Sequence, residues 1–296
     1  MKIKAISLFR TNLIITDPDQ EGEMMNEIIT SQTHYDEQGN ETERLTFSPS
    51  GEPEERILIR YQHGKAVEEI LELEGETAER TTREFDSNGL LIAEYRHYQD
   101  GEPDKITYTY ESGRLVSRIT TDSDGEEGEK HLWNYEGDKL VKEESINEYG
   151  DTDLIRTHQY HPNGQLAETE EVRISDDNKT RTVFIFSESG ILIQEKRYDS
   201  RGNLVARSTV TPGENNLPAF TEEETVMGKT TTEFTYDEKG NNILLLEKDT
   251  DGKILTTISR SYDEAGNAIS TEVLTEPALN RPGQHYRLRY DYEYYS

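Results

Sequence analysis

The chain contains 296 residues, of which 61 are acidic and 32 are basic, and its formal net charge at pH 7 is −29. A charge of this size disfavours nonspecific binding to the phosphate backbone of nucleic acids and to anionic lipid surfaces. Cysteine is absent, which excludes disulfides and thiolate metal sites. No apolar run reaches the length of about 18 residues that a membrane-spanning helix needs, so we expect no membrane insertion.

Hydrophobic residues make up 31% of the chain, and the mean hydropathy is −0.91. These values approach those of disordered chains, which bury too little apolar surface to offset the entropy lost on ordering. The 17 tyrosines, however, recur with other aromatic and β-branched residues at regular intervals. The sequence therefore predicts a folded protein whose core is thin and spread along the chain.

Residues 1–30 are expected to form N-terminal capping strands. The opening stretch MKIKAISLFRTN has an apolar run that Arg10, Thr11 and Asn12 interrupt, and no small-residue cleavage site follows it. A strand is therefore favoured over a secretory signal. With Met1 as the native start, this predicts a cytoplasmic protein, and export by a specialised secretion system is the alternative.

Residues 31–270 contain a repeat of about 25 residues, marked by turns in which an aromatic residue precedes a glycine by four positions, as in YDEQG (35–39) and YDEKG (236–240). Shorter versions, such as YESG (110–113), keep the period. A second turn lies midway in nearly every unit, as in DSDG (122–125) and DTDG (249–252). We predict structural roles for the glycines of the first turn, which are Gly39, Gly64, Gly89, Gly113, Gly137, Gly164, Gly190, Gly240 and Gly266.

The segments between these turns alternate in side-chain character, which is the signature of strands. In RLVSRITT (114–121), for example, Leu115, Ser117 and Ile119 fall on one face. Parallel pairing needs a crossover of about a dozen residues, so strands joined by short turns pair antiparallel. The predicted fold is all-β: a long antiparallel β-meander of about twenty strands, built from hairpin repeats and forming a twisted open sheet.

The stretch TPGENNLPAFTEEETVMGK (211–229) interrupts the pattern. Its two prolines and its Asn pair weaken strand pairing, which would leave Leu217 and Phe220 exposed on a loop. Loops in a rigid scaffold often carry recognition, so both residues are candidates for contact with a partner. An irregular hairpin is the alternative interpretation.

Residues 271–296 are expected to form a C-terminal capping or edge strand. In HYRLRYDYEYYS one face carries Tyr286, Tyr290, Tyr292 and Tyr294, alternating with charged residues. Edge strands expose unpaired backbone groups, and tyrosine is common at binding hot spots. We therefore expect a partner protein, or a second copy of the chain, to dock on this strand, and a purely capping role is the alternative.

The sequence contains no motif that indicates catalysis. Nucleophile elbows, phosphate-binding glycine loops and dinucleotide fingerprints are absent. DSDG and DTDG lack the remaining ligands of a calcium loop and are interpreted as turns. His158 and His161 are three apart, so a strand places them on opposite faces and they do not share a metal. We expect a protein that is not an enzyme and needs no cofactor or metal.

Trp133, the single tryptophan, is a further candidate for partner binding, with local packing as the alternative.

The block YTYESGRLVSRITTDSDG (108–125), together with FTYDEKGN (234–241) and SYDEAGN (261–267), resembles the YD repeat of RHS proteins. YHPNGQL (160–166) is similar to MORN-like antitoxin-type repeats as well. The RHS resemblance implies a coiling β-meander that in larger proteins forms a hollow shell around a toxic domain. This chain has no DPxGL-type self-cleavage motif and only about ten repeats, so we expect a free-standing sheet or an incomplete shell.

Three functions follow as hypotheses. The first is a non-catalytic acidic scaffold that binds a basic protein, and the RHS resemblance implies a toxin or effector as that partner, with a role in immunity, chaperoning or delivery. The second is a structural or adhesin-like protein of the cell envelope. The third is a shell fragment that encloses cargo.

Overall fold

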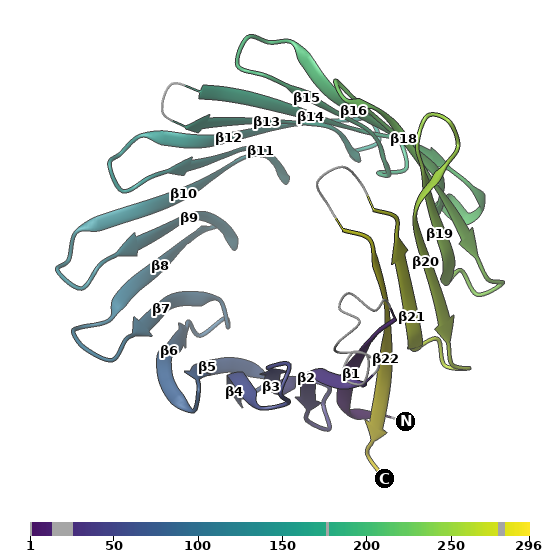
Figure 1. Ribbon diagram of the computed structural model, residues 1–296. Helices are drawn as coiled ribbons and strands as arrows, with labels where there is room; N and C mark the ends of the chain where they lie inside the picture. Colours follow the sequence, from purple (N-terminus) through teal and green to yellow (C-terminus); the bar gives the residue numbers. More distant parts are fainter. Residues whose placement is uncertain (1, 14–25, 176–177, 278–281) are drawn as a thin grey trace. The chain divides into compact units, whose positions relative to one another are not determined.

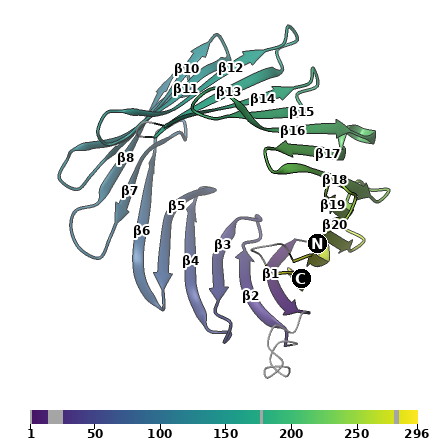
Figure 2. The ribbon, with the colours of Figure 1, turned by 45° about the horizontal axis from the view of Figure 1, so that its top comes forward.

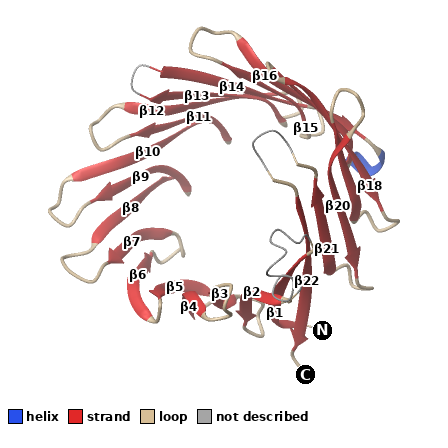
Figure 3. Ribbon diagram, viewed as in Figure 1, coloured by secondary structure: helices blue, strands red, loops and turns tan. Residues whose placement is uncertain are grey.

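The computed structural model describes residues 2–13, 26–175, 178–277 and 282–296. Strands dominate these residues: they form 22 strands and one short 3₁₀ helix, η2 (Glu214–Asn216) (Figure 3). The all-β class and the antiparallel meander are as predicted, and the number of strands is close to the expected twenty.

The chain divides into two compact units, of which the first comprises Met1–Thr82 with Thr232–Ser296 and the second comprises Arg83–Thr231. The first unit holds β1 (Ile3–Asn12), β2 (Ile28–Tyr35), β3 (Glu41–Phe47), β4 (Pro53–Gln62), β5 (Lys65–Leu73), β19 (Asn242–Lys248), β20 (Ile254–Tyr262), β21 (Ala268–Thr275) and β22 (Gln284–Tyr294). The second holds β7 (Leu91–His97), β8 (Asp104–Glu111), β9 (Arg114–Thr121), β10 (Glu127–Glu136), β11 (Lys139–Ile146), β12 (Thr152–Tyr160), β13 (Leu166–Ser175), β14 (Asn178–Phe186), β15 (Leu192–Tyr198), β16 (Leu204–Pro212) and β17 (Pro218–Thr225). The unit boundaries fall inside β6 (Glu76–Phe85) and β18 (Gly228–Tyr236).

Within each unit, strands that follow one another along the chain pair antiparallel. In the second unit, each strand from β7 to β16 pairs with the next one (Figure 1). In the first unit, β1 to β5 lie side by side in chain order (Figure 2). This order follows from the short turns, because a reversal of a few residues can only return the chain beside the strand it has just left.

The four-residue turns share one geometry, in which an aspartate, or less often a serine, asparagine or histidine, begins the turn and a glycine ends it. In the turn after β2, the Gly39 amide donates to the Asp36 carbonyl at 3.0 Å, and Asp36 Oδ1 accepts the Gln38 and Asn40 amides at 2.9 Å each. Gly39 has φ = 90°, a conformation that a residue with a Cβ adopts only at a cost. The midway turns DSDG and DTDG have the same bonds around Asp122 and Asp249, so they are hairpin turns, as interpreted from the sequence.

Some of the shorter turns contain two residues. Ser112 and Gly113 both have positive φ, at 51° and 79°, and they join the paired residues Glu111 and Arg114. Two successive positive φ values define the type I′ turn, whose twist matches that of a hairpin. All nine glycines predicted to be structural have positive φ.

The aromatic residue before the main turn lies opposite a β-bulge. Tyr135 pairs with Leu140, but Asn134 pairs with Lys142, so Val141 is an extra residue on β11. The same shift recurs beside other main turns, where the extra residues are Thr42, Val116, Ala167, Ile193 and Ile269. The two consecutive apolar residues that often follow these turns therefore oppose one aromatic residue across a bulge.

Tyrosine hydroxyls join successive strands at the same margin. Tyr110, Tyr160 and Tyr262 donate to the carbonyls of Leu91, Leu140 and Asn242, at 3.0, 2.7 and 3.0 Å. Each acceptor lies near the start of the preceding strand, which belongs to the preceding hairpin. The tyrosine therefore packs against the bulge of one hairpin and bonds the backbone of another.

The core is thin, as the composition predicts. Among the described residues the buried hydrophobic side chains are those of Ala5, Ala93, Ile106, Val183 and Ala206. Six polar residues are also buried, including Glu68, Ser145 and Glu171. Cross-strand pairs must therefore supply much of the stability, and each contributes on the order of 0.2–1 kcal/mol.

The first and last strands of the chain pair with each other. β22 lies between β21 and β1, and Ser7 is the register partner of Asp291. The predictions of an edge strand at 271–296 and of an open sheet are therefore wrong, because an open meander would leave β1 and β22 unpaired with each other. The alternating tyrosines identified β22 as a strand, but no local feature identified β1 as its neighbour.

The irregular stretch 211–229 is a hairpin, the alternative given above. Pro212 pairs with Pro218, and the Gly213 amide donates to the Leu217 carbonyl at 2.7 Å across η2. Leu217 follows η2, and Phe220 lies within β17 opposite Thr211; both side chains are partly buried. The expectation that both would be exposed on a loop is therefore wrong, because the prolines occupy the end of the hairpin without preventing pairing.

Candidate functional site

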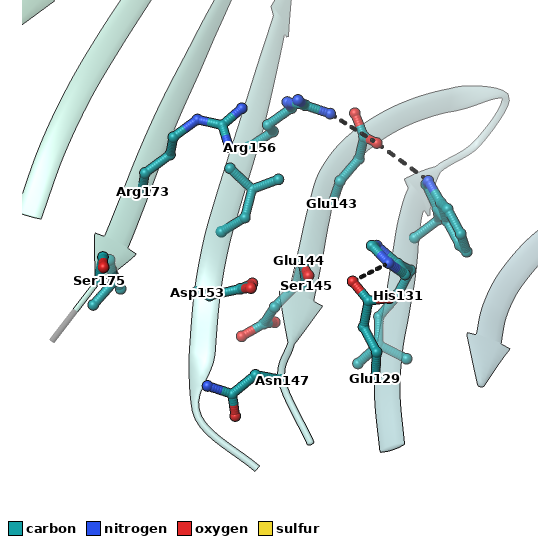
Figure 4. Close-up of a pocket in the computed structure, with 14 residues that line it drawn as sticks. Glu129, His131, Glu143, Glu144, Ser145, Asn147, Asp153, Arg156, Arg173 and Ser175 are labelled. Carbon is teal, nitrogen blue, oxygen red and sulfur yellow. Dashed lines mark hydrogen bonds and ion pairs between the residues drawn. The ribbon is translucent and has the colours of Figure 1, made fainter. Parts of the chain in front are cut away.

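A depression of about 740 Å³ lies on strands β10 to β13 of the second unit (Figure 4). Its floor includes Ser145, which is only 4% exposed and pairs with His131 on one side and Leu154 on the other. A small side chain between two larger ones leaves the surface hollow. The lining comprises Glu129, His131, Leu132, Trp133, Glu143, Glu144, Ser145, Asn147, Asp153, Leu154, Arg156, Arg173, Ile174 and Ser175.

Trp133 forms one wall of the depression, together with His131. The two rings are stacked, with centroids 6.1 Å apart and planes inclined by 26°. Trp133 Nε1 donates to Glu143 Oε2 at 3.2 Å, and His131 Nε2 lies 3.0 Å from Glu129 Oε1. The pair thus forms an aromatic surface whose polar atoms contact carboxylates.

Glu143 is the register partner of Trp133 and connects three groups. Besides the indole, its carboxylate contacts His158 Nε2 at 2.9 Å and Arg156 Nη1 at 3.9 Å. His158 Nδ1 lies 2.9 Å from Thr169 Oγ1, so both ring nitrogens are occupied. This arrangement fixes the orientation of the Glu143 carboxylate.

Arg156 and Arg173 are both held by Glu171. Their Nε atoms lie 2.6 and 2.7 Å from different oxygens of this carboxylate, which is 8% exposed. Both arginines that line the depression are therefore ion-paired with the buried Glu171, and Arg156 also contacts Glu143. The cross-strand pair of Arg156 and Glu171 replaces apolar packing at this position.

Asp153 is the exception among these carboxylates. Its Oδ1 atom is buried and accepts no hydrogen bond from the described residues. Asp153 is the extra residue of a bulge, because Ser145 pairs with Leu154 and Ile146 pairs with Thr152. At this bulge position most hairpins carry an apolar residue, such as Val116, Val141, Ile193, Val205 or Leu255.

Glu144 lies next to Asp153 in the lining (Figure 4). The Lys142 ammonium, 2.8 Å from Glu144 Oε2, holds the pKa of this carboxyl below its usual range. Glu144 is therefore ionised at neutral pH, and its charge is offset by Lys142.

A second depression, of about 500 Å³, lies on β3, β4 and β5 of the first unit. Arg56 bridges Glu43 and Glu72 at 2.7 and 3.3 Å, much as Arg156 bridges Glu143 and Glu171. The bulge residue here is Glu54, since Phe47 pairs with Pro53 and Thr46 with Glu55. Both depressions thus coincide with an acidic bulge residue, but no aromatic residue lines the second one.

The four predicted tyrosines of β22 lie on one face of that strand in the first unit. Tyr292 is stacked on Tyr294, with ring centroids 6.4 Å apart, and donates to the Ala268 carbonyl at 2.8 Å. Arg10 lies over the ring of Tyr286, 4.1 Å from its centroid, and Tyr290 is the register partner of Leu8. These contacts join β22 to both neighbouring strands.

The remaining predicted partner-binding residues lie apart from one another in the second unit. Trp133 is in the depression on β10, whereas Leu217 and Phe220 lie at the β16–β17 hairpin. No sequence pattern pointed to the residues around Trp133, above all Glu143, Arg156 and Asp153. The signal that could have identified Asp153 was an acidic residue three positions after the turn glycine Gly150, where apolar residues recur.

Among the described residues, no group of three or more His, Asp or Glu side chains is arranged to hold a metal ion. No described helix is long and apolar enough to cross a membrane. His158 and His161 have separate contacts, since His161 Nε2 lies 3.1 Å from the Phe186 carbonyl.

No protein-family model matches the chain, and no curated protein sequence matches it. Solved structures with some similarity include a chain of the crystal structure of TcdB2-TccC3-TEV, at 15% identity and a TM-score of 0.37 over 87% of this chain and 16% of that chain. A porin-like protein from Bacteroides uniformis is 12% identical, with a TM-score of 0.34 over 98% of this chain and 96% of that chain. A porin-like protein from Bacteroides vulgatus is 10% identical, with a TM-score of 0.27 over 99% of each chain. The chain thus spans about a sixth of the length of the first of these structures.

Proposed function

We propose that the chain is a YD-repeat-like, non-catalytic β scaffold that binds a basic protein through its acidic surface. The aspartate–glycine turns and the aromatic residue opposite the bulge beside the main turns support the relation to YD repeats. The partner class that this resemblance implies is a toxin or effector, which the scaffold would neutralise, chaperone or deliver.

The observation that carries the proposal is that arginines of the chain are ion-paired with its own glutamates. Arg56, Arg156 and Arg173 are bound by glutamates of their own or neighbouring strands, and Arg80, Arg83 and Arg287 are bound in the same way. Because the chain has 61 acidic and 32 basic residues, pairing of this kind leaves a large excess of carboxylates for solvent. Such an excess attracts basic partners over long range.

The turns contribute part of this excess. Asp36, Asp199, Asp237 and Asp263 each accept a hydrogen bond from an asparagine side chain four residues later, which lowers the pKa of the aspartate. The turn aspartates therefore stay ionised well below neutral pH. They form recurrent negative groups along the margins of the strands.

A pull-down from extract of the source cells tests the proposal. The immobilised chain should recover a basic protein at low ionic strength and release it at about 0.5 M salt, where the Debye length falls to a few ångströms. A variant in which the four turn aspartates become asparagine keeps the Oδ1 acceptors of the backbone amides and should recover less of the partner. Recovery of no partner, or of one that is indifferent to salt, would contradict the proposal.

A further inference from the structure

We propose that the depression around Trp133 binds the guanidinium group of an arginine side chain. The inference rests on the proposed function, because the arginine would be supplied by the basic partner. Three features of the depression support it: the charges of the lining, the aromatic wall and the unpaired Oδ1 of Asp153.

The charges of the lining favour a cation. Four carboxylates face two arginines in the depression, and both arginines are bound to the buried Glu171. Glu144 is offset by Lys142, whereas Asp153 has no described cation and its buried Oδ1 has no described donor. A buried carboxylate oxygen without a donor is costly, so a cationic donor that reaches it would gain a charge-assisted hydrogen bond.

The aromatic wall favours a planar cation. The stacked rings of Trp133 and His131 offer a flat π surface beside the carboxylates of Glu129 and Glu143. Guanidinium stacks on indole and donates in a fixed fork to carboxylates, whereas ammonium is a compact, strongly hydrated point charge. The side chain of Glu129 is 48% exposed and lies at the rim, where it can contact an incoming arginine.

The bulge explains why this hairpin differs from its neighbours. Val116 and Val141 each place an apolar side chain opposite an aromatic residue. Asp153, in contrast, places a carboxylate opposite Ile146. Residues that break a local pattern without a compensating contact are expected at functional sites. The depression of the first unit has the acidic bulge residue Glu54 but no aromatic wall, so it provides a matched control.

The single tryptophan makes the test direct, because tryptophan emission reports on this depression alone. N-acetyl-L-arginine methylamide is titrated into the full chain, and the corresponding citrulline derivative serves as a neutral ligand of the same shape. We expect a saturable change in emission with the arginine derivative, with a dissociation constant on the order of 1 mM, and no saturable change with the citrulline derivative.

Asp153→Asn should weaken binding of the arginine derivative by about tenfold or more, because it removes the charge and keeps the shape. Glu54→Gln, in the other depression, and Glu188→Gln, at an exposed turn, each remove one charge elsewhere and should bind as the unmodified chain does. Far-UV circular dichroism checks that each variant is folded, and a chain with Asp153→Asn that unfolds is replaced by Glu129→Gln, which alters only the rim.

Equal responses to the two derivatives, or unchanged binding after Asp153→Asn, would overturn the inference. The outcome is separable from that of the proposed function. If a basic partner is recovered in a salt-dependent manner but Asp153→Asn changes neither its recovery nor the binding of the arginine derivative, the scaffold function stands and the arginine site fails. If the arginine derivative binds and no basic protein is recovered, the opposite holds.

Discussion

At the scale of single residues, the four-residue turns depend on two positions that act differently. The aspartate accepts two backbone amides through its side chain, and the glycine permits a positive φ. The first contribution is electrostatic and responds to pH, whereas the second is steric and does not. The two can therefore be separated by substitution.

Gly125→Ala should lower the free energy of unfolding by about 1–2 kcal/mol, the cost of a left-handed conformation for a residue with a Cβ. Gly125 has φ = 86°, and an added Cβ meets nothing within 4 Å, so the cost would come from the backbone alone. Gly128→Ala is the control, since its backbone is not in that region and its Cβ would make an ordinary contact of 3.7 Å. Chemical denaturation of both variants measures the difference, and equal effects would contradict the steric explanation.

Asp237 should make the stability of the chain depend on pH. Asn241 donates a side-chain hydrogen bond to this carboxylate and lowers its pKa in the folded state. A depressed pKa stabilises the fold above the unfolded-state value of about 3.9, and this contribution is lost as the pH falls through the folded-state value. The advantage of the natural chain over Asp237→Asn should therefore shrink between about pH 5 and pH 2.

The asparagine variant is a fair comparison, because Asn147 already occupies the same turn position. Its Oδ1 accepts the amides of Tyr149 and Asp151 at 3.0 and 2.9 Å. Asp237→Asn thus keeps the Oδ1 acceptor of the two backbone amides, and it removes both the titration and the bond from Asn241 to Oδ2, since an amide NH2 cannot accept it. A stability difference that stays constant with pH in denaturation experiments would show that the carboxylate charge has no role in the turn.

At the scale of elements, hairpins are joined by the tyrosine hydroxyls as well as by the strand pairs. Tyr160→Phe removes the bond from the hydroxyl to the Leu140 carbonyl, 2.7 Å long, and keeps the ring. We expect a loss of about 1 kcal/mol in the free energy of unfolding. Tyr149→Phe is the matched control at an 81% exposed turn residue and should change stability by less than about 0.5 kcal/mol. Equal losses in thermal or chemical denaturation would contradict the joining role.

The sequence was sufficient to predict the hairpins, because both signals are local. The turn residues specify their own geometry, and the alternation of RLVSRITT matches β9 (Arg114–Thr121). The residues facing Trp133 could not be predicted in the same way. Counting back from the paired Glu136 and Lys139 places Lys142 opposite Trp133, whereas the bulge at Val141 places Glu143 there. A shift of one residue exchanges the two faces of a strand, so the site depends on a bulge that the alternation does not specify.

At the scale of the whole molecule, the pairing of β1 with β22 was beyond the reach of local signals. The two strands are separated by more than 250 residues, and both have the alternation expected of either an edge or a central strand. The pairing changes the interpretation of the tyrosine row, because the backbone groups of β22 bond to β21 and β1 and are not available to a partner. The acidic surface and the depression around Trp133 then become the stronger candidates for binding.

The central structural claim is most directly tested by a disulfide between the first and last strands, since the chain has no cysteine of its own. Ser7→Cys combined with Asp291→Cys places the thiols on register partners, within the reach of a disulfide. Ser7→Cys combined with Arg287→Cys is the control, because four residues along a strand separate the positions by roughly 13 Å. Mild oxidation of the native chain should cross-link the first pair, seen as faster migration without reductant, and leave the second pair free. Failure of the Ser7–Asp291 pair to cross-link, or equal cross-linking of both pairs, would contradict the pairing of β1 with β22.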